Sequence, residues 1–493
     1  MLDTFINKLT PYYQNLRYST VFLILFGVSL FVRLPFFFRD YIDRDESTFI
    51  IMAQSWVDGH LPYTELWDLK PPITFLFFAC IIYIFGKSFL AIRMIGALII
   101  AITAFYTYKI SLTATTKKVG FWAAIGCVAL QSMFGSLQGV MSEHICMVFF
   151  IPALYILIKK TNAFWYAIAG FLMGLSIMTK LNLAYAVLVM GIYIFFIHVK
   201  KRAYGEGALK SALFGIGVIT VIFLTFLPYY LNNYPEIWWK SVILASLEYA
   251  GARRYSFWKM APTFLPIMAF LVFTWRKKLI PFDNPQIQLL LVAITGVLVS
   301  FIRGGRINSH YLIQLYPMLI VLVSITLAQI YLLKKLNPKI FLWVLLALPI
   351  ESYLEYYAVL KNKLERGTFY NGEGITVPRF LKENELETKN VFFTEYHIGY
   401  WVLGTKPPTK AATHPSNIGK PEMFPFYDNP RKTFMSELNY ILATVKPKII
   451  VVRNNRSIFD VVNVIQNSYI NAYLTMHYSK ISDVDGAGIY QRL

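Results

Sequence analysis

The sequence is poor in acidic residues, in cysteine and in the motifs that bind nucleotides. Only 27 of its 493 residues are aspartate or glutamate, against 47 lysines and arginines, for a net charge of +20. The three cysteines (Cys80, Cys127 and Cys146) all lie in apolar segments. We therefore predict neither a disulfide framework nor a cysteine metal site. No basic stripe with interleaved aromatic residues points to a nucleic acid partner, and no glycine-rich loop points to a nucleotide site.

Long apolar segments are what the sequence has in abundance. Hydrophobic residues make up 56% of the chain and the mean hydropathy is +0.50, values that exclude a soluble globular protein. Apolar runs of about 18 residues predict transmembrane helices and make the lipid bilayer the first expected partner. We expect about eleven, over residues 18–38, 88–110, 119–134, 143–158, 163–179, 182–199, 210–231, 259–275, 286–302, 310–332 and 339–357.

A short apolar segment at residues 73–86 decides the predicted topology. Its 14 residues span only about 21 Å as a helix, less than the ~30 Å hydrocarbon core. If this segment does not cross the membrane, the basic clusters from Lys8 to Lys335 all lie on one side, as the preference of lysine and arginine for the cytoplasmic side requires. If it does cross, the first cluster lies on the opposite side from all later clusters. We therefore expect it to lie in the interface of a plasma (inner) membrane, with the loop 39–87 outside.

The composition changes after residue 357 to that of an ordinary mixed sequence. Residues 390–397, 448–453 and 486–493 are typical of strands, and residues 433–445 and 458–474 of helices. We predict an α-helical multi-pass membrane domain over 1–357, with interfacial helices in its first external loop, followed by a small extracytoplasmic α/β domain over 358–493. The motif TKPPTKAATHPSN within this tail is more typical of a structural loop than of a site.

The loop after the first predicted span concentrates the scarce acids. Residues 39–72 hold seven of them: Asp40, Asp43, Asp45, Glu46, Asp58, Glu65 and Asp68. Residues 46–57 have helical periodicity with Trp56 on the apolar face, which predicts a helix lying in the interface plane. Asp43 and Glu46 have the spacing of a capping box, so helix capping accounts for some of these acids. Lys70, followed by two prolines, adds a cation at the far end of the loop and favours a functional site.

The predicted outer face also collects Glu143, Lys180, Arg303, Arg306 and His310. Carboxylates beside cations at a membrane surface suit the transfer of a sugar from a lipid phosphate to a hydroxyl group. A carboxylate takes the proton of the acceptor, and cations hold the departing phosphate. Simpler interpretations stay open: both lysines could snorkel to the headgroups, Glu143 suits a helix N-terminus, and a lone histidine is usually a hydrogen-bonded structural residue.

Four motifs resemble, in the same order, those of the membrane GT-C glycosyltransferases of the protein O-mannosyltransferase and aminoarabinose-transferase type. They are RDESTFIIMAQSWVDGHLPY with WDLKPP, MSEHICMVFF, GLSIMTK and GGRINSHYLIQLYP. The resemblance covers the membrane part, whereas the tail matches only in position and size. It implies the GT-C fold and a glycosyltransferase that uses a polyprenyl-phosphate sugar donor, inverts the anomeric centre and acts on a protein or glycolipid hydroxyl outside the membrane.

The resemblance also implies roles for individual residues. Asp45 is similar to the catalytic carboxylate, Lys70 to the lysine near the donor phosphate, and Glu143 to an acidic residue that contacts acceptor or sugar. The other substrate-binding residues that we expect are Glu46, Lys180, Arg303, Arg306, His310, Tyr311 and Gln314. No cofactor and no metal ligand is predicted, although a divalent metal stays open because some GT-C relatives use one.

Two other function classes compete with the enzyme. A transporter or flippase of a lipid-linked sugar would have charges at mid-membrane and inverted repeats, whereas here the charges lie at the predicted outer edge and no repeat is evident. A membrane scaffold that presents the tail gives no reason for the acids of the loop or for Lys70. We therefore predict the enzyme, and a lipid translocation assay in vesicles separates it from a flippase.

Overall fold

The computed structural model describes residues 15–252, 255–305, 307–330, 343–344, 346–413 and 417–493. Their contacts form two compact units. The first consists of described residues within 1–34, 93–225 and 253–354, and the second of those within 35–92, 226–252 and 355–493. The first external loop and the C-terminal tail thus share one unit, while the predicted boundary near residue 357 stays a prediction.

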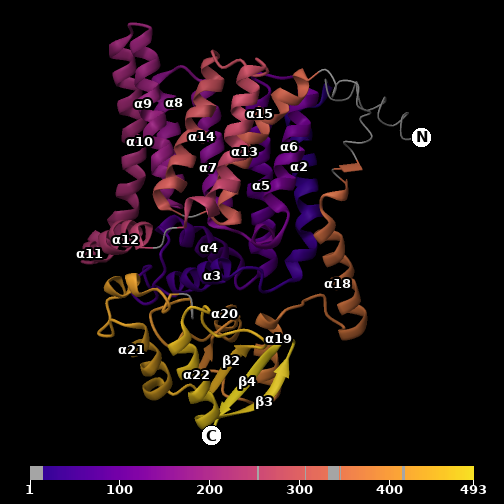
Figure 1. Cartoon of the computed structure of the whole chain (residues 1–493), viewed down its shortest axis with the longest axis vertical. Helices are drawn as coiled ribbons and strands as arrows, with labels where there is room; N and C mark the ends of the chain where they lie inside the picture. Colours follow the sequence, from indigo (N-terminus) through magenta and orange to yellow (C-terminus); the bar gives the residue numbers. More distant parts are fainter. Residues whose placement is uncertain (1–14, 253–254, 306, 331–342, 345, 414–416) are drawn as a thin grey trace. The chain divides into compact units, whose positions relative to one another are not determined.

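The first unit is a bundle of long helices joined by short turns (Figure 1). Its helices are α2 (Tyr18–Arg33), α5 (Phe89–Ser111), α6 (Lys117–Ser132), α7 (Ser142–Lys159), α8 (Ala163–Ile177), α9 (Ala184–Lys200), α10 (Tyr204–Leu231), α13 (Phe257–Arg276), α14 (Pro285–Gly304) and α15 (Tyr316–Gln329). The first few residues of α5 and the last turns of α10 belong to the second unit. Within the bundle α2 packs on α6, α6 on α15, α7 on α8, and α9 on α14.

Seven of the described helices are long and apolar enough to cross a membrane, judged by length and composition. They correspond to seven of the eleven predicted spans and confirm an integral membrane protein. The helices α6, α8 and α15 have 16, 15 and 14 residues, so α8 and α15 are shorter than the spans predicted there, whereas α6 has the predicted length and begins two residues earlier. The last predicted span lies partly in residues 331–342, outside the described residues. Helix α18 (Ile350–Arg366) begins within that span and continues past residue 357 through a charged, amphipathic sequence.

Small residues allow two helices of the bundle to approach closely. A Cβ added to Gly170 of α8 would lie 2.0 Å from the carbonyl oxygen of Phe214 in α10, and one added to Gly217 would lie 2.3 Å from the carbonyl oxygen of Ala167. Neither position has room for a side chain. Backbone contact of this kind is how membrane helices gain packing energy without a hydrophobic driving force.

The side chain of Arg33, at the end of α2, fastens the turn before α7. It is 1% exposed, and its two Nη atoms donate to the carbonyl oxygens of Leu137 (2.6 Å), Gln138 (2.9 Å) and Gly139 (2.8 Å). These carbonyls belong to η2 (Gly135–Gln138) and the residue after it. Arg33 therefore satisfies buried backbone acceptors that the helices themselves leave unpaired.

The Arg33→Met variant is expected to lower the free energy of unfolding by at least about 3 kcal/mol, because charge-assisted hydrogen bonds to buried carbonyls are lost. Thermal unfolding of the purified protein in detergent measures the change. Arg33→Lys keeps the charge but not the forked geometry, and it should recover only part of the loss. A melting temperature for Arg33→Met equal to that of the wild type would contradict this role.

The second unit begins with the external loop and contains most of the short helices. They are α3 (Arg44–Val57), α4 (Pro72–Phe85), α11 (Pro235–Trp238), η4 (Trp239–Leu244), α12 (Ala245–Ala252), α19 (Glu373–Glu383), α20 (Ile398–Leu403), η6 (Pro421–Phe426), α21 (Phe434–Asn439), η7 (Tyr440–Val445) and α22 (Val464–His477). Helix α4 has the 14 residues expected of the short apolar segment, and its entry is fixed by Pro71 and Pro72.

A four-stranded sheet forms the centre of the tail, in the order β1-β2-β4-β3. Strands β1 (Val391–Phe393) and β2 (Ile449–Arg453) are parallel, whereas β3 (Tyr478–Val484) and β4 (Ala487–Arg492) form an antiparallel hairpin that adds to β2. The sequence predicted β1, β2 and β4. It missed β3 because most of the side chains of this edge strand are polar and exposed.

The loop and the tail are joined by main-chain and side-chain contacts inside the second unit. Trp67 forms an isolated parallel bridge with Ala411, in the proline-rich segment that we interpreted as a structural loop. Helix α20 packs on α3, where Trp401 Nε1 donates to Gln54 Oε1 at 2.9 Å. The tail therefore supports the acidic loop.

Candidate functional site

The N-terminus of α3 carries three of the seven acids of the loop, namely Asp43, Asp45 and Glu46. Asp43 is the N-cap, and its side chain accepts a hydrogen bond from Asp45 N at 2.8 Å, so capping accounts for Asp43. Helix α3 is buried on nearly all sides from Glu46 to Ala53, with Glu46 itself 1% exposed, and Trp56 is only half-buried. The expectation of a helix with a single apolar face is therefore wrong, because α4 and α20 both pack on α3, whereas its place in the membrane interface stays a prediction.

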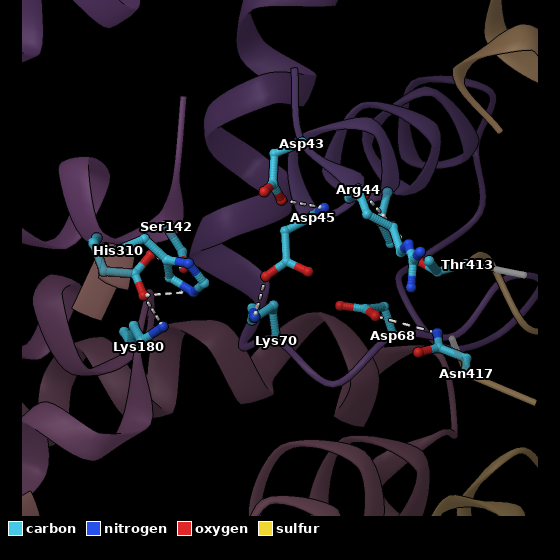
Figure 2. Close-up of polar contacts among 12 residues, drawn as sticks. Asp43, Arg44, Asp45, Asp68, Lys70, Ser142, Lys180, His310, Thr413 and Asn417 are labelled. Carbon is cyan, nitrogen blue, oxygen red and sulfur yellow. Dashed lines mark hydrogen bonds and ion pairs between the residues drawn. The ribbon is translucent and has the colours of Figure 1, made fainter. Parts of the chain in front are cut away.

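Asp45 and Lys70 form an ion pair. Lys70 Nζ lies 3.1 Å from Asp45 Oδ2, and the side chains of Lys70 and Asp45 are 20% and 39% exposed, so both remain accessible to a ligand. Figure 2 shows the two side chains pointing toward one another across the loop. The main chain of Lys70 is fixed as well, because its carbonyl oxygen accepts a hydrogen bond from the buried Tyr63 hydroxyl.

Asp68 is a third carboxylate of this group, and it was not among the predicted site residues. It is buried and accepts a hydrogen bond from Asn417 Nδ2 at 3.2 Å (Figure 2). Burial raises the pKa of Asp68 above its ordinary value, the Lys70 ammonium lowers it, and the Asp45 charge raises it further. Asp68 belongs to the WDLKPP motif, so its position in the sequence was a signal, but its contact with the distant Asn417 was not.

A second group of polar residues lies in the first unit, around Glu143 in the first turn of α7. Lys180 Nζ donates to Glu143 Oε1, and His310 Nε2 lies 3.8 Å from the same oxygen. Ser142 Oγ donates to Glu143 Oε2 at 3.1 Å. Glu143 is fully buried, Lys180 is 8% exposed, and Nζ of Lys180 also lies 4.3 Å from the ring centroid of Tyr311. Glu143, Lys180, His310 and Tyr311, all predicted site residues, thus gather around one buried ion pair.

The remaining predicted residues have different environments. Gln314, in η5 (Ser309–Gln314), is buried, and its Oε1 accepts a hydrogen bond from Asn182 Nδ2 at 2.9 Å. Its Nε2 has no hydrogen-bond partner among the described residues. Arg303 is exposed in the last turn of α14, and Arg306 lies outside the described residues. Asn182 and Ser142 were not predicted, because neither type of residue stands out at a helix end.

The two groups offer different chemistry. The accessible Asp45–Lys70 pair provides a proton acceptor beside a cation, which is the combination that activates a hydroxyl and stabilises an anionic leaving group. The Glu143–Lys180 pair is buried, and each charge is balanced by the other. Because both side chains are enclosed by protein, their charged atoms are held in fixed positions. Within the part of the chain that the structure describes, no three histidine, cysteine or acidic side chains are arranged to hold a metal ion.

Residues 69–231 match the family model described as dolichyl-phosphate-mannose-protein mannosyltransferase. The structure is similar to the crystal structure of ArnT from Cupriavidus metallidurans bound to undecaprenyl phosphate, with a TM-score of 0.61, 12% identity and 97% of each chain covered. The apo form of the same protein gives a TM-score of 0.53 and 11% identity, over 97% of this chain and 99% of that one. The chain has the GT-C fold. No match was found among curated proteins.

The matches confirm the resemblance that the motifs indicated, and with it a membrane glycosyltransferase. The segment that the family model matches includes Lys70, Glu143 and Lys180, but it begins after Asp45 and ends before Arg303. The roles of the individual residues therefore rest on the motifs and on the contacts described above.

Proposed function

We propose that the chain transfers a sugar from a polyprenyl-phosphate donor to a hydroxyl group, with Asp45 as the general base and Lys70 on the donor phosphate. The observation that carries the proposal is the ion pair between an accessible aspartate and an accessible lysine, in a loop braced by the tail. The polyprenyl-phosphate donor is further supported by the family match and by the undecaprenyl phosphate in the similar ArnT structure.

In the proposed reaction Asp45 takes the proton of the acceptor hydroxyl as its oxygen attacks the anomeric carbon. The bond between this carbon and the phosphate oxygen breaks, and the electron pair leaves with the phosphate. Direct displacement inverts the anomeric centre. Because the leaving group is already anionic, it needs a cation more than a general acid, and the Lys70 ammonium supplies that charge. Asp68, held by Asn417, adds a second carboxylate that interacts electrostatically with Lys70.

We assign substrate binding to the group around Glu143. Its carboxylate is held by Lys180, His310 and Ser142, and the unsatisfied amide of Gln314 is a further donor for a sugar hydroxyl or a phosphate. Arg303 and Arg306 are proposed as additional phosphate contacts. The distribution of lysine and arginine favours the outer face of the plasma membrane as the place of the reaction. Protein hydroxyls and glycolipid hydroxyls are both suitable acceptors.

Reconstitution into vesicles tests the proposal directly. Purified protein is incubated with polyprenyl-phosphate sugars extracted from its native membrane, and the expected result is release of polyprenyl phosphate with sugar appearing on an acceptor. Mass spectrometry of glycans and lipids from a deletion strain identifies donor sugar and acceptor together. Translocation of the donor across the vesicle without release of polyprenyl phosphate would instead establish the flippase.

The Lys70→Met variant is expected to lower kcat/KM for the donor by about 100-fold, because it removes a charge that acts on the leaving group. Lys70→Arg should retain part of the rate, since it keeps the charge but changes the geometry. Initial rates at several donor concentrations measure both effects. Lys382→Met, at an exposed position of α19 in the same unit, is the matched control. Equal losses in the two methionine variants would remove Lys70 from the donor site.

A further inference from the structure

A polar cavity in the second unit has no part in the proposed reaction. Its volume is about 500 Å³, and it is lined by residues just after β1, by the loop after β2 and by Arg44 at the start of α3. Strands β1 and β2 are parallel neighbours, so both chains leave the sheet at the same edge. The carboxyl edge of parallel strands is where α/β domains bind ligands. The volume is that of a small-molecule site.

Three arginines, Arg44, Arg453 and Arg456, line this cavity. Arg44 is paired with Glu395, with Nη2 3.2 Å from Oε2. Arg453, at the end of β2, and Arg456, in the loop after it, have no ion-pair partner among the residues that the structure describes. Arg453 is half-buried and Arg456 exposed, so both are within reach of a ligand. The lining holds three arginines against two carboxylates, so its net charge is positive and favours an oxyanion, which arginine binds with paired hydrogen bonds.

The other lining residues favour a ligand that also carries hydroxyl groups. Glu395 and Asp460 accept hydrogen bonds, and the side-chain amide of Asn455 both donates and accepts. A site for inorganic phosphate alone would not need carboxylates, which repel an anion. Arginines and carboxylates together match a carbohydrate with one anionic substituent. The charged substituent pairs with the arginines and the hydroxyls with the acids.

We propose that this cavity binds an anionic carbohydrate, either a sugar phosphate or a uronate, as the recognition element of the acceptor. This inference rests on the proposed function, because the ligand is assigned as the acceptor of the proposed sugar transfer. Arg44 and Asp45 are consecutive residues in the first turn of α3, and His397 Nε2 lies 3.0 Å from the Arg44 carbonyl oxygen, which fixes that turn to the tail. The tail would thus select the acceptor while the adjacent residue activates it.

Isothermal titration calorimetry of the full-length protein in detergent tests the proposal. The probes are glucose 6-phosphate, glucuronate, glucose and inorganic phosphate. We expect one of the two anionic sugars to bind at least tenfold more tightly than glucose and than inorganic phosphate, and which of them binds identifies the oxyanion. The double variant R453Q/R456Q should weaken this binding by about 30-fold, as expected for lost charge-assisted hydrogen bonds. Inorganic phosphate binding as tightly as the sugars, or no binding of either anionic sugar, would overturn the inference.

Two further variants separate a binding defect from a folding defect. R453K/R456K keeps both charges and should bind more tightly than the glutamine variant, and Arg366→Gln, whose side chain pairs with Asp485 outside the cavity, should bind like the wild type. If R453Q/R456Q binds the anionic sugar as tightly as the wild type does, the proposal is wrong. The Asp45→Asn variant must keep wild-type binding even where transfer is lost. In the wild-type protein, by contrast, absent transfer with intact binding counts against the proposed function, and absent binding with intact transfer counts against this inference alone.

Discussion

Replacement of Asp45 with asparagine is expected to abolish sugar transfer, with a loss in kcat of about 10³-fold or more. Asparagine has the same shape but does not accept the proton of the acceptor hydroxyl. The KM for the donor should change little, because Lys70 remains in place to hold the phosphate. Initial rates of polyprenyl phosphate release at saturating donor measure kcat, and a melting curve confirms that the variant is folded.

The neighbouring acid supplies the matched control for this result. Asp43 caps α3, and asparagine is an equally good N-cap, so Asp43→Asn should leave both stability and transfer near the wild type. The pair of variants differs only in which carboxylate of the same turn is neutralised. Turnover by Asp45→Asn at the wild-type rate would show that another group is the base.

The second large effect is expected on stability, at the buried ion pair of Glu143 and Lys180. Either Glu143→Leu or Lys180→Met alone leaves one charge buried without its partner, and each should lower the free energy of unfolding by about 3–5 kcal/mol. The double variant removes both charges. It should therefore be clearly more stable than the sum of the two single effects predicts. Thermal unfolding in detergent, read as a double-mutant cycle, measures the coupling.

An exposed pair gives the comparison for this cycle. Glu236 and Lys240 are one turn apart at the surface, with the two charged atoms 2.8 Å apart, and the corresponding cycle should show little coupling. Additive effects at Glu143 and Lys180 would contradict a buried ion pair. If the double variant recovers stability but not transfer, the loss of activity belongs to the charges themselves and supports their role in substrate binding.

Local patterns in the sequence were sufficient for the class of protein and for many of its elements. Apolar segment length predicted the seven helices that are long enough to cross a membrane, and it predicted that residues 73–86 form a helix too short to do so. Alternating and continuous apolar runs located β1, β2 and β4. The order of four motifs indicated the GT-C fold, which the similarity to ArnT confirms. Each of these signals is contained in a few neighbouring residues, which is why one sequence is enough to detect it.

Contacts between distant residues were decided only by the tertiary structure. Glu143 meets Lys180 and His310 because three separate turns converge, and Asp68 meets Asn417 because the tail packs on the first loop. Burial of α3 by α4 and α20 could not be read from its own periodicity, since the side chains that cover it come from elsewhere in the chain. The sequence alone determined a membrane glycosyltransferase with an acidic loop after its first span. Which side chains face one another depends on long-range packing, and no local pattern encodes it.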